Sequence, residues 1–533
     1  MRLILYFSFI FFLLAGSNGN LYAQQTAPAD TAGKKQIQIL QADRLNFEKL
    51  NDSSELQSLA GNVIVKQEKT FFYCDSAVIN KLLNVLQAFG HVHINDNDSI
   101  NTYSDYLKYL GKEKKAFLKD NVKLTDGKGV LTTNELAYDV ATKIGIYTKG
   151  GKLVSGKTVL TSTEGVYYGE TKDTYFKKKV VLVDPDYTIK TDTLLYNSFI
   201  DKTTFIVPTV ITSGTSTKIF TSDGYYDLKN KKAYFGKRPV IQDSTTTLVA
   251  DEVATDDSTG FGEARGHVIY KDTAQGTLLT SNNLKTNKKE GSYLATEKPV
   301  MAIKQDKDSI FIAADTLFSS KLSSLPKDSS SGAFSNQPIN KTDSSKDRYI
   351  EAYYHVRIFS DSLQAVGDSL YYSAQDSVFR LFKSPIVWAQ ENQITGDTIY
   401  LYTQNKKPKR LYVFENALAI SKAAQGYFNQ VKGRTINGYF KDGNIDNLRA
   451  KGNAESVYYG EDERKKFVGV NKSASDIIDM YFEDRKPQRV VLRSGLKGTF
   501  FPMRQVNHDE LRLRGFKLYD DKRPKTKAEL YSN

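Results

Sequence analysis

Ser104-Asp105-Tyr106-Leu107-Lys108-Tyr109 belongs to a pattern that recurs along the chain and decides the fold. Related copies are Thr191-Asp192-Thr193-Leu194-Leu195-Tyr196 and Gly367-Asp368-Ser369-Leu370-Tyr371-Tyr372. Successive copies are separated by about 30 residues, and self-similarity at such a period indicates stacked units that share one core. The copies begin near the following residues: Ile39, Phe71, Ile100, Val130, Val159, Thr188, Lys218, Thr247, Thr277, Ile310, Leu363, Ile394, Thr435 and Ser475.

Within each copy, apolar and polar residues alternate as they do in half-buried strands. In Gly90-His91-Val92-His93-Ile94 the aliphatic residues face one side, and Asn121-Val122-Lys123-Leu124-Thr125 repeats the alternation. Turn-forming clusters such as Asp126-Gly127-Lys128-Gly129 separate the strands. Beyond the N-terminal stretch no long segment keeps a helical period, so the sequence predicts an all-β protein.

Composition divides the chain into segments. Arg2, the apolar run from Leu3 to Ala15 and the small-residue site Leu21-Tyr22-Ala23 predict a cleaved secretory signal peptide. We expect an exported chain with these segments: signal peptide 1–23, flexible leader 24–36, regular repeats 37–319, Ser-rich linker or loop insertion 320–347, second repeat block 348–505 and basic tail 506–533. The sequence leaves open whether the two repeat blocks form one stack.

The formal net charge of +13 predicts attraction to anionic partners. Lysine is also favoured at sheet edges, where it prevents edge-to-edge aggregation, so the charge has a plain structural explanation as well. We expect no nucleic-acid partner.

The usual catalytic motifs are missing from the sequence: it has no G-x-S-x-G elbow, no P-loop and no H-E-x-x-H. His91 and His93 lack a third ligand for a metal, and Asp96-Asn97-Asp98 lacks the glycine and the late glutamate of a calcium loop. We therefore expect a protein that is not an enzyme and has no catalytic residue, no metal site and no cofactor.

An aspartate recurs at one position of the repeat. A row of carboxylates could serve catalysis or bind cations, but a residue repeated in every unit more often bonds the backbone at a turn or a strand start. We interpret these residues as structural: Asp43, Asp75, Asp105, Asp192, Asp223, Asp251, Asp315, Asp368 and Asp397.

The inward faces of the strands have two possible uses. They can close into a plain core, which the residues alone favour, or the two walls can stay apart and hold an apolar ligand. In the second case the candidate groove-lining residues are Val63, Val65, Val92, Ile94, Val122, Leu124, Val268 and Tyr270.

Ala42-Asp43-Arg44-Leu45, followed by Leu59-Ala60-Gly61-Asn62-Val63-Ile64-Val65, resembles the OstA-like (organic-solvent-tolerance) domain of periplasmic lipopolysaccharide-transport proteins. Ala88-Phe89-Gly90-His91-Val92 and Ala264-Arg265-Gly266-His267-Val268 carry the same pattern. The resemblance is best over residues 37–320 and weaker over 348–505. Asn134-Glu135 replaces the aspartate in one copy, and the glycine is missing from several second strands.

The resemblance implies an elongated, twisted β-jellyroll, similar to a β-solenoid, with an open apolar groove. It implies a non-enzymatic periplasmic bridge or chaperone that shields the acyl chains of lipopolysaccharide or lipid A on the way to the outer membrane. Its expected partners are lipopolysaccharide-transport proteins of the inner and outer membranes and further copies of itself, joined head to tail by strand pairing. Its expected location is the periplasm, with peripheral attachment to the outer membrane as an option.

Two other functions remain open on the sequence. One is a secreted structural or adhesive β-repeat protein with a closed core. The other is a carbohydrate-active β-helix enzyme, which would need a carboxylate cluster on one outer face.

Overall fold

The computed structural model describes residues 36–51, 54–96, 100–304, 309–325, 346–404, 407–423, 426–462, 464, 466–483 and 486–532. The expected signal peptide, nearly all of the leader, most of the segment 320–347 and the Asn97-Asp98 part of the calcium-like sequence lie outside these ranges. The chain forms two compact units, Met1–Leu124 with Glu135–Thr142 (unit 1) and Thr125–Asn134 with Lys143–Asn533 (unit 2). Each is described separately.

The described residues form strands and short 3-10 turns and contain no α-helix, which confirms the all-β prediction. None of their helical turns has the length and apolarity needed to cross a bilayer. The strands up to the division of the units are β1 (Gln38–Gln41), β2 (Arg44–Asn51), β3 (Ser54–Gln67), β4 (Thr70–Asn80), β5 (Val85–Asp96), β6 (Ile100–Leu110), β7 (Lys115–Thr125) and β8 (Gly129–Asp139), the last of which contributes to both units.

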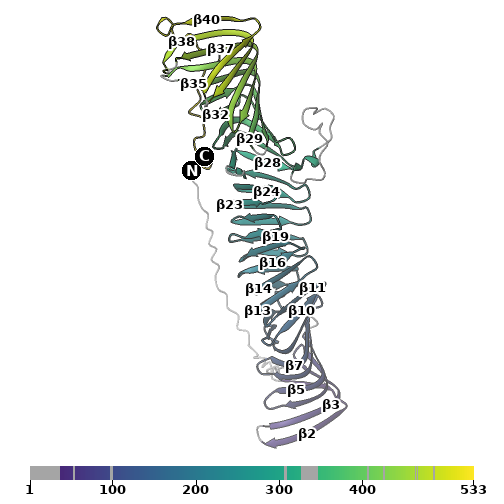
Figure 1. Cartoon of the computed structure of the whole chain (residues 1–533). Coiled ribbons are helices and arrows are strands. Elements are labelled where there is room, and N and C mark those ends of the chain that lie inside the picture. The colour runs from purple at the N-terminus through teal and green to yellow at the C-terminus, as the bar shows by residue number, and fades with distance from the viewer. Residues whose placement is uncertain are drawn as a thin grey trace, which may run out of the picture. The chain divides into compact units, whose positions relative to one another are not determined.

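The remaining elements belong to unit 2, where the strands succeed one another as rungs (Figure 1). They are β9 (Ile144–Tyr147), β10 (Gly151–Ser155), β11 (Thr158–Ser162), β12 (Glu164–Tyr168), β13 (Asp173–Val183), β14 (Tyr187–Asn197), β15 (Lys202–Phe205), β16 (Thr209–Ser213), β17 (Thr217–Thr221), β18 (Asp223–Asp227), β19 (Lys232–Gly236), β20 (Val240–Gln242), β21 (Thr246–Val249), β22 (Glu252–Asp256), β23 (Phe261–Asp272), β24 (Thr277–Asn287), β25 (Ser292–Thr296), β26 (Val300–Lys304), β27 (Ser309–Ala313), β28 (Thr316–Ser320), η2 (Leu322–Ser324), β29 (Tyr349–Phe359), β30 (Leu363–Ser373), β31 (Val378–Phe382), β32 (Ile386–Ala389), β33 (Asn392–Thr395), β34 (Thr398–Gln404), β35 (Lys407–Lys422), β36 (Phe428–Lys441), β37 (Asn444–Glu461), β38 (Phe467–Glu483), β39 (Lys486–Arg493), β40 (Lys497–Phe501), η5 (Met503–Gln505) and η6 (Lys527–Leu530).

A corner recurs in the middle of each repeat. In β23 the pairing with β24 shifts between Arg265 and Val268, because Gly266 and His267 bulge out with φ of 71° and 43°. The same pair of left-handed residues stands at Gly61 and Asn62 in β3, where the register with β4 shifts. An inserted bulge of this kind bends a strand sharply and re-aims its two arms.

The recurring aspartate holds this corner. The backbone N–H of Asp251 donates to the Gly266 carbonyl at 2.8 Å, and its carboxylate accepts from His267 Nδ1 at 2.6 Å and from Arg238 at 2.8 Å. In unit 1, Asp43 donates to the Gly61 carbonyl at 3.0 Å and accepts from Asn62 at 3.0 Å. The structural interpretation of the repeated aspartate is therefore confirmed at these corners.

The corners split unit 2 into two walls, because the arms before and after each corner pair with different neighbours. The first wall runs, in order of pairing, through β8, β10, β11, β13, β14, β16, β17, β20, β21, β23, β24, β26, β27, β29, β30, β32, β33, β35, β36, β37, β38 and β40. The second wall runs through β9, β12, β13, β14, β15, β18, β19, β22, β23, β24, β25, β28, β29, β30, β31, β34, β35, β36, β37, β38 and β39.

The two repeat blocks expected from the sequence are continuous within unit 2. β28 and β29, which flank the Ser-rich segment, pair directly from Thr316↔Tyr353 to Ser320↔Tyr349. β27 also pairs with β29 in the first wall. Residues 320–347 therefore interrupt the sequence without interrupting either wall.

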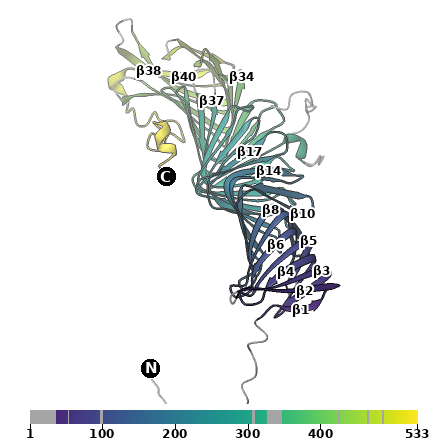
Figure 2. The ribbon, with the colours of Figure 1, turned by 90° about the horizontal axis from the view of Figure 1, so that it is seen from below.

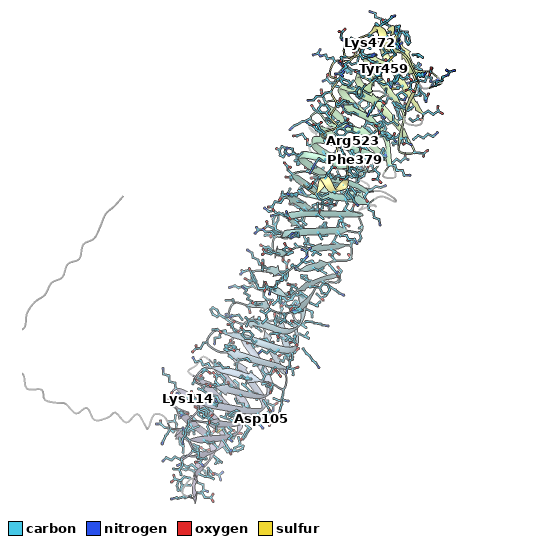
Figure 3. The ribbon with its side chains drawn as sticks, turned by 90° about the vertical axis from the view of Figure 1, so that its left-hand side faces the viewer. Asp105, Lys114, Phe379, Tyr459, Lys472 and Arg523 are labelled. Atoms are coloured by element: carbon cyan, nitrogen blue, oxygen red, sulfur yellow. The ribbon has the colours of Figure 1, made fainter. Side chains whose placement is uncertain are left out.

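The C-terminal residues pack against the outer face of the first wall. We call residues 502–532 the strap; it is the yellow end of the ribbon in Figure 2. Leu511 and Leu513 join a buried cluster with Leu418 and Ile420 of β35, and Leu530 packs on Val300 and Ala313. The strap thus runs back along strands that precede it by many repeats, with Arg523 part-way along it (Figure 3).

Three glutamines at outward positions of the first wall fix the strap. Gln430 accepts from the Leu513 backbone N–H at 2.8 Å. Gln393 donates to the Lys517 carbonyl at 2.7 Å and accepts from the Tyr519 N–H at 2.8 Å. Gln364 accepts from the Arg523 guanidinium at 2.7 and 2.9 Å. All three side chains are buried and have lost their hydrogen bonds to water, and the bonds to the strap replace them.

The corner predicts a specific effect of Gly266→Ala. A Cβ at Gly266 would lie 2.4 Å from the Asp251 carboxylate, whereas a Cβ at Gly156, also at positive φ, meets nothing within 4 Å. Both substitutions carry the left-handed penalty, but only Gly266→Ala must also displace the aspartate. We expect it to destabilise unit 2 by about 1–3 kcal/mol more than Gly156→Ala, measured by denaturant unfolding. Equal midpoints for the two variants would contradict the role of the aspartate.

Candidate functional site: an apolar cleft between the walls of unit 2

An unbroken row of inward side chains crosses the first wall from strand to strand. Each member is the register partner of the next: Ile189, Ile211, Ile219, Ile241, Leu248, Tyr270, Leu279, Met301 and Ile312. The two ends of the row are buried, Ile189 and Ile312 both at 0% exposure. The middle of the row, from Ile219 to Tyr270, is only half-buried. The walls are therefore closed at both ends of this stretch and open between them.

The half-buried stretch faces a cavity of about 740 Å³. That volume falls within the range of about 300–1,000 Å³ typical of small-molecule sites. The second wall supplies the floor, with Phe235, Val253 and Leu284 buried beneath the cavity. Small residues of that wall, Ala233 and Ala264, also line it, and their short side chains leave the space that longer ones would fill.

Two aromatic pairs connect the walls across this cavity. Tyr187 of the first wall contacts Tyr226 of the second, with ring centroids 4.7 Å apart. Tyr270 of the first wall contacts Tyr293 of the second at 5.7 Å. All four rings line the cavity, and each pair bridges the two walls. The aliphatic residues of the row lie between the two pairs along the first wall.

The tyrosines place uncharged hydroxyls in an apolar surrounding. Burial raises the pKa of Tyr270 to about 12, and burial also raises the pKa values of Tyr187 and Tyr226 well above their ordinary value. The Tyr226 hydroxyl donates to Asp257 at 2.9 Å. The Tyr187 hydroxyl is buried and has no hydrogen-bond partner among the described residues. The cavity thus combines its aliphatic row with one buried hydroxyl, that of Tyr187, which has no partner among the described residues.

Charged residues stand at the rim. Arg348 lines the cavity beside Tyr293, with its guanidinium carbon 5.4 Å from the ring centroid, and it donates to the Gly291 carbonyl at 3.0 Å. Lys231 and Asp186 form an exposed ion pair at 3.4 Å. The apolar surface is therefore bordered by groups of both signs.

The groove residues expected from the sequence divide into two groups. Tyr270 lines the cavity. The other seven are inward as expected but are at most 3% exposed: Val63, Val65, Val92, Ile94, Val122, Leu124 and Val268. Their role in a groove stays a prediction. The sequence analysis missed Ile219, Ile241 and Leu248, which are half-buried in the cavity lining. Their strands are short and alternate weakly, so the pattern gave little signal.

Three of the five histidines bond the corner aspartates. Nδ1 of His91, His267 and His355 each donates to the corner aspartate, at 2.7 Å for Asp75, 2.6 Å for Asp251 and 2.9 Å for Asp315. His93 turns away from His91: its Nε2 lies 2.9 Å from Asn101 Oδ1. The structure therefore separates the two histidines that the sequence placed on one strand face.

One family model matches the N-terminal part of the chain. The family model described as OstA-like protein matches residues 34–192. Residues 34–192 are an OstA-like segment. The resemblance inferred from Ala42-Asp43 and Gly61-Asn62 is thereby confirmed, and the OstA-like segment includes the corner held by Asp43 and reaches Tyr187 at the edge of the cavity.

Other comparisons add less. No curated protein matches the chain. Among solved structures, one similar chain is LptH of Pseudomonas aeruginosa, described as the LptA-homologous periplasmic component of the lipopolysaccharide transport device. The two chains are 16% identical, the match covers 26% of this chain and 81% of LptH, and the TM-score is 0.20, too low to support an argument.

The open row predicts that a charge at Leu248 weakens uptake of an apolar dye. Leu248→Asp places a carboxylate in the cavity, whereas Val249→Asp changes the neighbouring residue, which does not line it. Lost apolar burial of about 1.5–3 kcal/mol corresponds to roughly 10- to 100-fold weaker binding. The measurement is fluorescence titration with N-phenylnaphthylamine. Equal weakening by both substitutions would show that the dye binds elsewhere.

Proposed function

We propose that the chain is a non-enzymatic lipid carrier that shields the acyl chains of lipopolysaccharide, acting as a bridge or chaperone in the periplasm on the way to the outer membrane. The observation that supports this proposal most directly is the inward row of the first wall, which opens into an apolar cavity between Ile219 and Tyr270. The OstA-like segment supports the choice of lipopolysaccharide or lipid A as the cargo.

The energetics explain why such a row is useful. Passing one acyl chain of about fourteen carbons through water costs roughly 11 kcal/mol at about 0.8 kcal/mol per methylene. A row of apolar side chains that continues from strand to strand lowers this cost at every step, since no single residue has to bind the lipid tightly. Function then belongs to the row, and we assign no catalytic residue, metal or cofactor to it.

Photo-crosslinking at neighbouring positions tests the cargo. Ile219 points into the cavity, whereas Phe220, the next residue of β17, is 39% exposed and absent from its lining. A photoreactive amino acid at Ile219 is expected to give lipopolysaccharide adducts in cells, and the same residue at Phe220 is expected to give few. Adducts at neither position in a folded protein would favour the alternative, a structural or adhesive repeat protein.

The terminal strands suit pairing with further chains. In unit 1, β1 and β2 each pair with β3, and their side chains Leu40, Leu45 and Phe47 are 52%, 60% and 55% exposed. In unit 2, β39 and β40 each pair with β38. Edges with unpaired backbone groups and exposed apolar side chains invite strand addition. We propose that these edges join other lipopolysaccharide-transport proteins or further copies of the chain.

Charges on β2 are expected to weaken this joining. Leu45→Lys with Phe47→Lys removes apolar surface and adds like charges at the edge, so self-association measured by analytical ultracentrifugation should fall. The matched control is Leu82→Lys with Leu83→Lys, which changes two exposed leucines of unit 1 in the turn after β4. A decrease of the same size in the control would contradict a role for the edge.

A further inference from the structure

A second cavity lies elsewhere in unit 2, between the corners of the repeats and the strap. Its volume is about 750 Å³. Lys298 and Lys383 reach it from two corners, Arg357 from β29, and Lys522 and Leu530 from the strap. It shares no lining residue with the apolar cavity, and it lies outside the OstA-like segment.

Positive charge dominates this cavity. Among its described lining residues Asp315 is the one carboxylate, and His355 Nδ1 donates to it at 2.9 Å. Lys383 pairs with Asp368 at 3.0 Å. Within the described residues, no carboxylate lies within ion-pairing distance of Lys298, Arg357 or Lys522. The cavity therefore carries more cations than its own carboxylates neutralise.

Arg357 is the deepest of these cations. Its terminal nitrogens donate to the strap carbonyls of Glu529 and Leu530 at 3.1 and 3.5 Å, and its Nε is buried without a hydrogen-bond partner. A buried guanidinium N–H without a partner is costly, because such groups are nearly always satisfied by protein or water. Apolar residues such as Val356, Val366 and Ile386 complete the lining, and apolar walls concentrate the field of the cations.

We propose that this cavity binds a phosphate group. Lysine ammonium groups attract phosphate as point charges, and the arginine guanidinium offers directed N–H donors. Lysine and arginine side chains together therefore suit the charged oxygens of a phosphate group. Because the strap supplies Lys522 and Leu530, binding also fixes the end of the strap on the corners. The phosphate can be that of a lipid headgroup or of a soluble phosphate compound, and the experiment separates these sources.

The test compares the full chain with two triple variants. The site variant is Lys298→Gln with Lys383→Gln and Lys522→Gln, which leaves Arg357 and its bonds to the strap in place. The control variant makes the same charge change at exposed lysines of the same unit: Lys152→Gln, Lys190→Gln and Lys218→Gln. Thermal unfolding of both variants checks that they fold.

Two probes are used. Inorganic pyrophosphate is titrated by calorimetry, and co-sedimentation is measured with phosphatidylcholine vesicles with and without phosphatidic acid. We expect the site variant to bind at least one phosphate probe roughly tenfold more weakly than the full chain, with the control changed less than about twofold. Loss confined to pyrophosphate identifies a soluble phosphate ligand, and loss confined to phosphatidic acid vesicles identifies a lipid headgroup.

Either of two results overturns the proposal: the full chain binds neither probe, or the two variants are weakened equally. Neither result affects the lipid cargo, because the crosslinking at Ile219 tests a separate cavity.

Discussion

The hydrogen bonds of the corner aspartate are the interaction on which the structure depends. At corners such as Gly61-Asn62 and Gly266-His267, two consecutive residues adopt the left-handed conformation, which costs about 1–2 kcal/mol for each residue that is not glycine. A hydrogen bond to a charged group counteracts part of this cost, and solvent screens the bond where both groups are exposed. At Asp251 the His267 bond therefore counteracts part of the strain of His267 itself, and Gly266 adopts its conformation without that strain. A corner without the carboxylate would leave the strain uncompensated.

Once the corner forms, the rest of the architecture follows from pairing. The bulge shifts the register between the two arms, so each arm continues into a different wall. The walls diverge from the corner, and the size of the inward side chains decides whether they meet. Where Leu279 faces inward they are closed, and where Ile241 and Leu248 face Ala233 and Ala264 a cavity remains.

The sequence predicted the parts of this structure that repeat. The period, the alternation of Val92 and Ile94 and the structural role of the aspartates depend on local patterns, which a single chain displays directly. The corner itself was hidden, because His91 reads as one more residue of a strand while its φ of 41° takes it out of the alternation. The location of the cavity was hidden for a related reason. The sequence predicts which residues face inward, but whether they are buried depends on the size of the side chains on the opposite wall.

The strap could not be predicted from its own composition, which is basic and lacks a repeat, but the wall beneath it carried a signal. Ile386-Val387-Trp388-Ala389 is buried at every residue, and a strand of a two-walled stack alternates only if one face meets solvent. A continuous apolar run in an otherwise alternating protein indicates that another segment covers the outer face. Gln364 and Gln393, outward amides inside this region, mark where that segment needs hydrogen bonds.

The strap and the apolar cavity occupy successive parts of the same wall. Leu530, the last buried side chain of the strap, packs on Val300 of β26. Tyr293 of β25, the strand before β26 in the sequence, and Arg348 line the end of the cavity. Beyond that point the strap buries the outer face of the wall, so the strands there gain cohesion from both sides. The Tyr187–Tyr226 and Tyr270–Tyr293 contacts join the inner faces of the strands that line the cavity. A stretch with fewer buried apolar contacts separates at lower free energy than its neighbours. The wall is thus most easily parted where its inward row is already open.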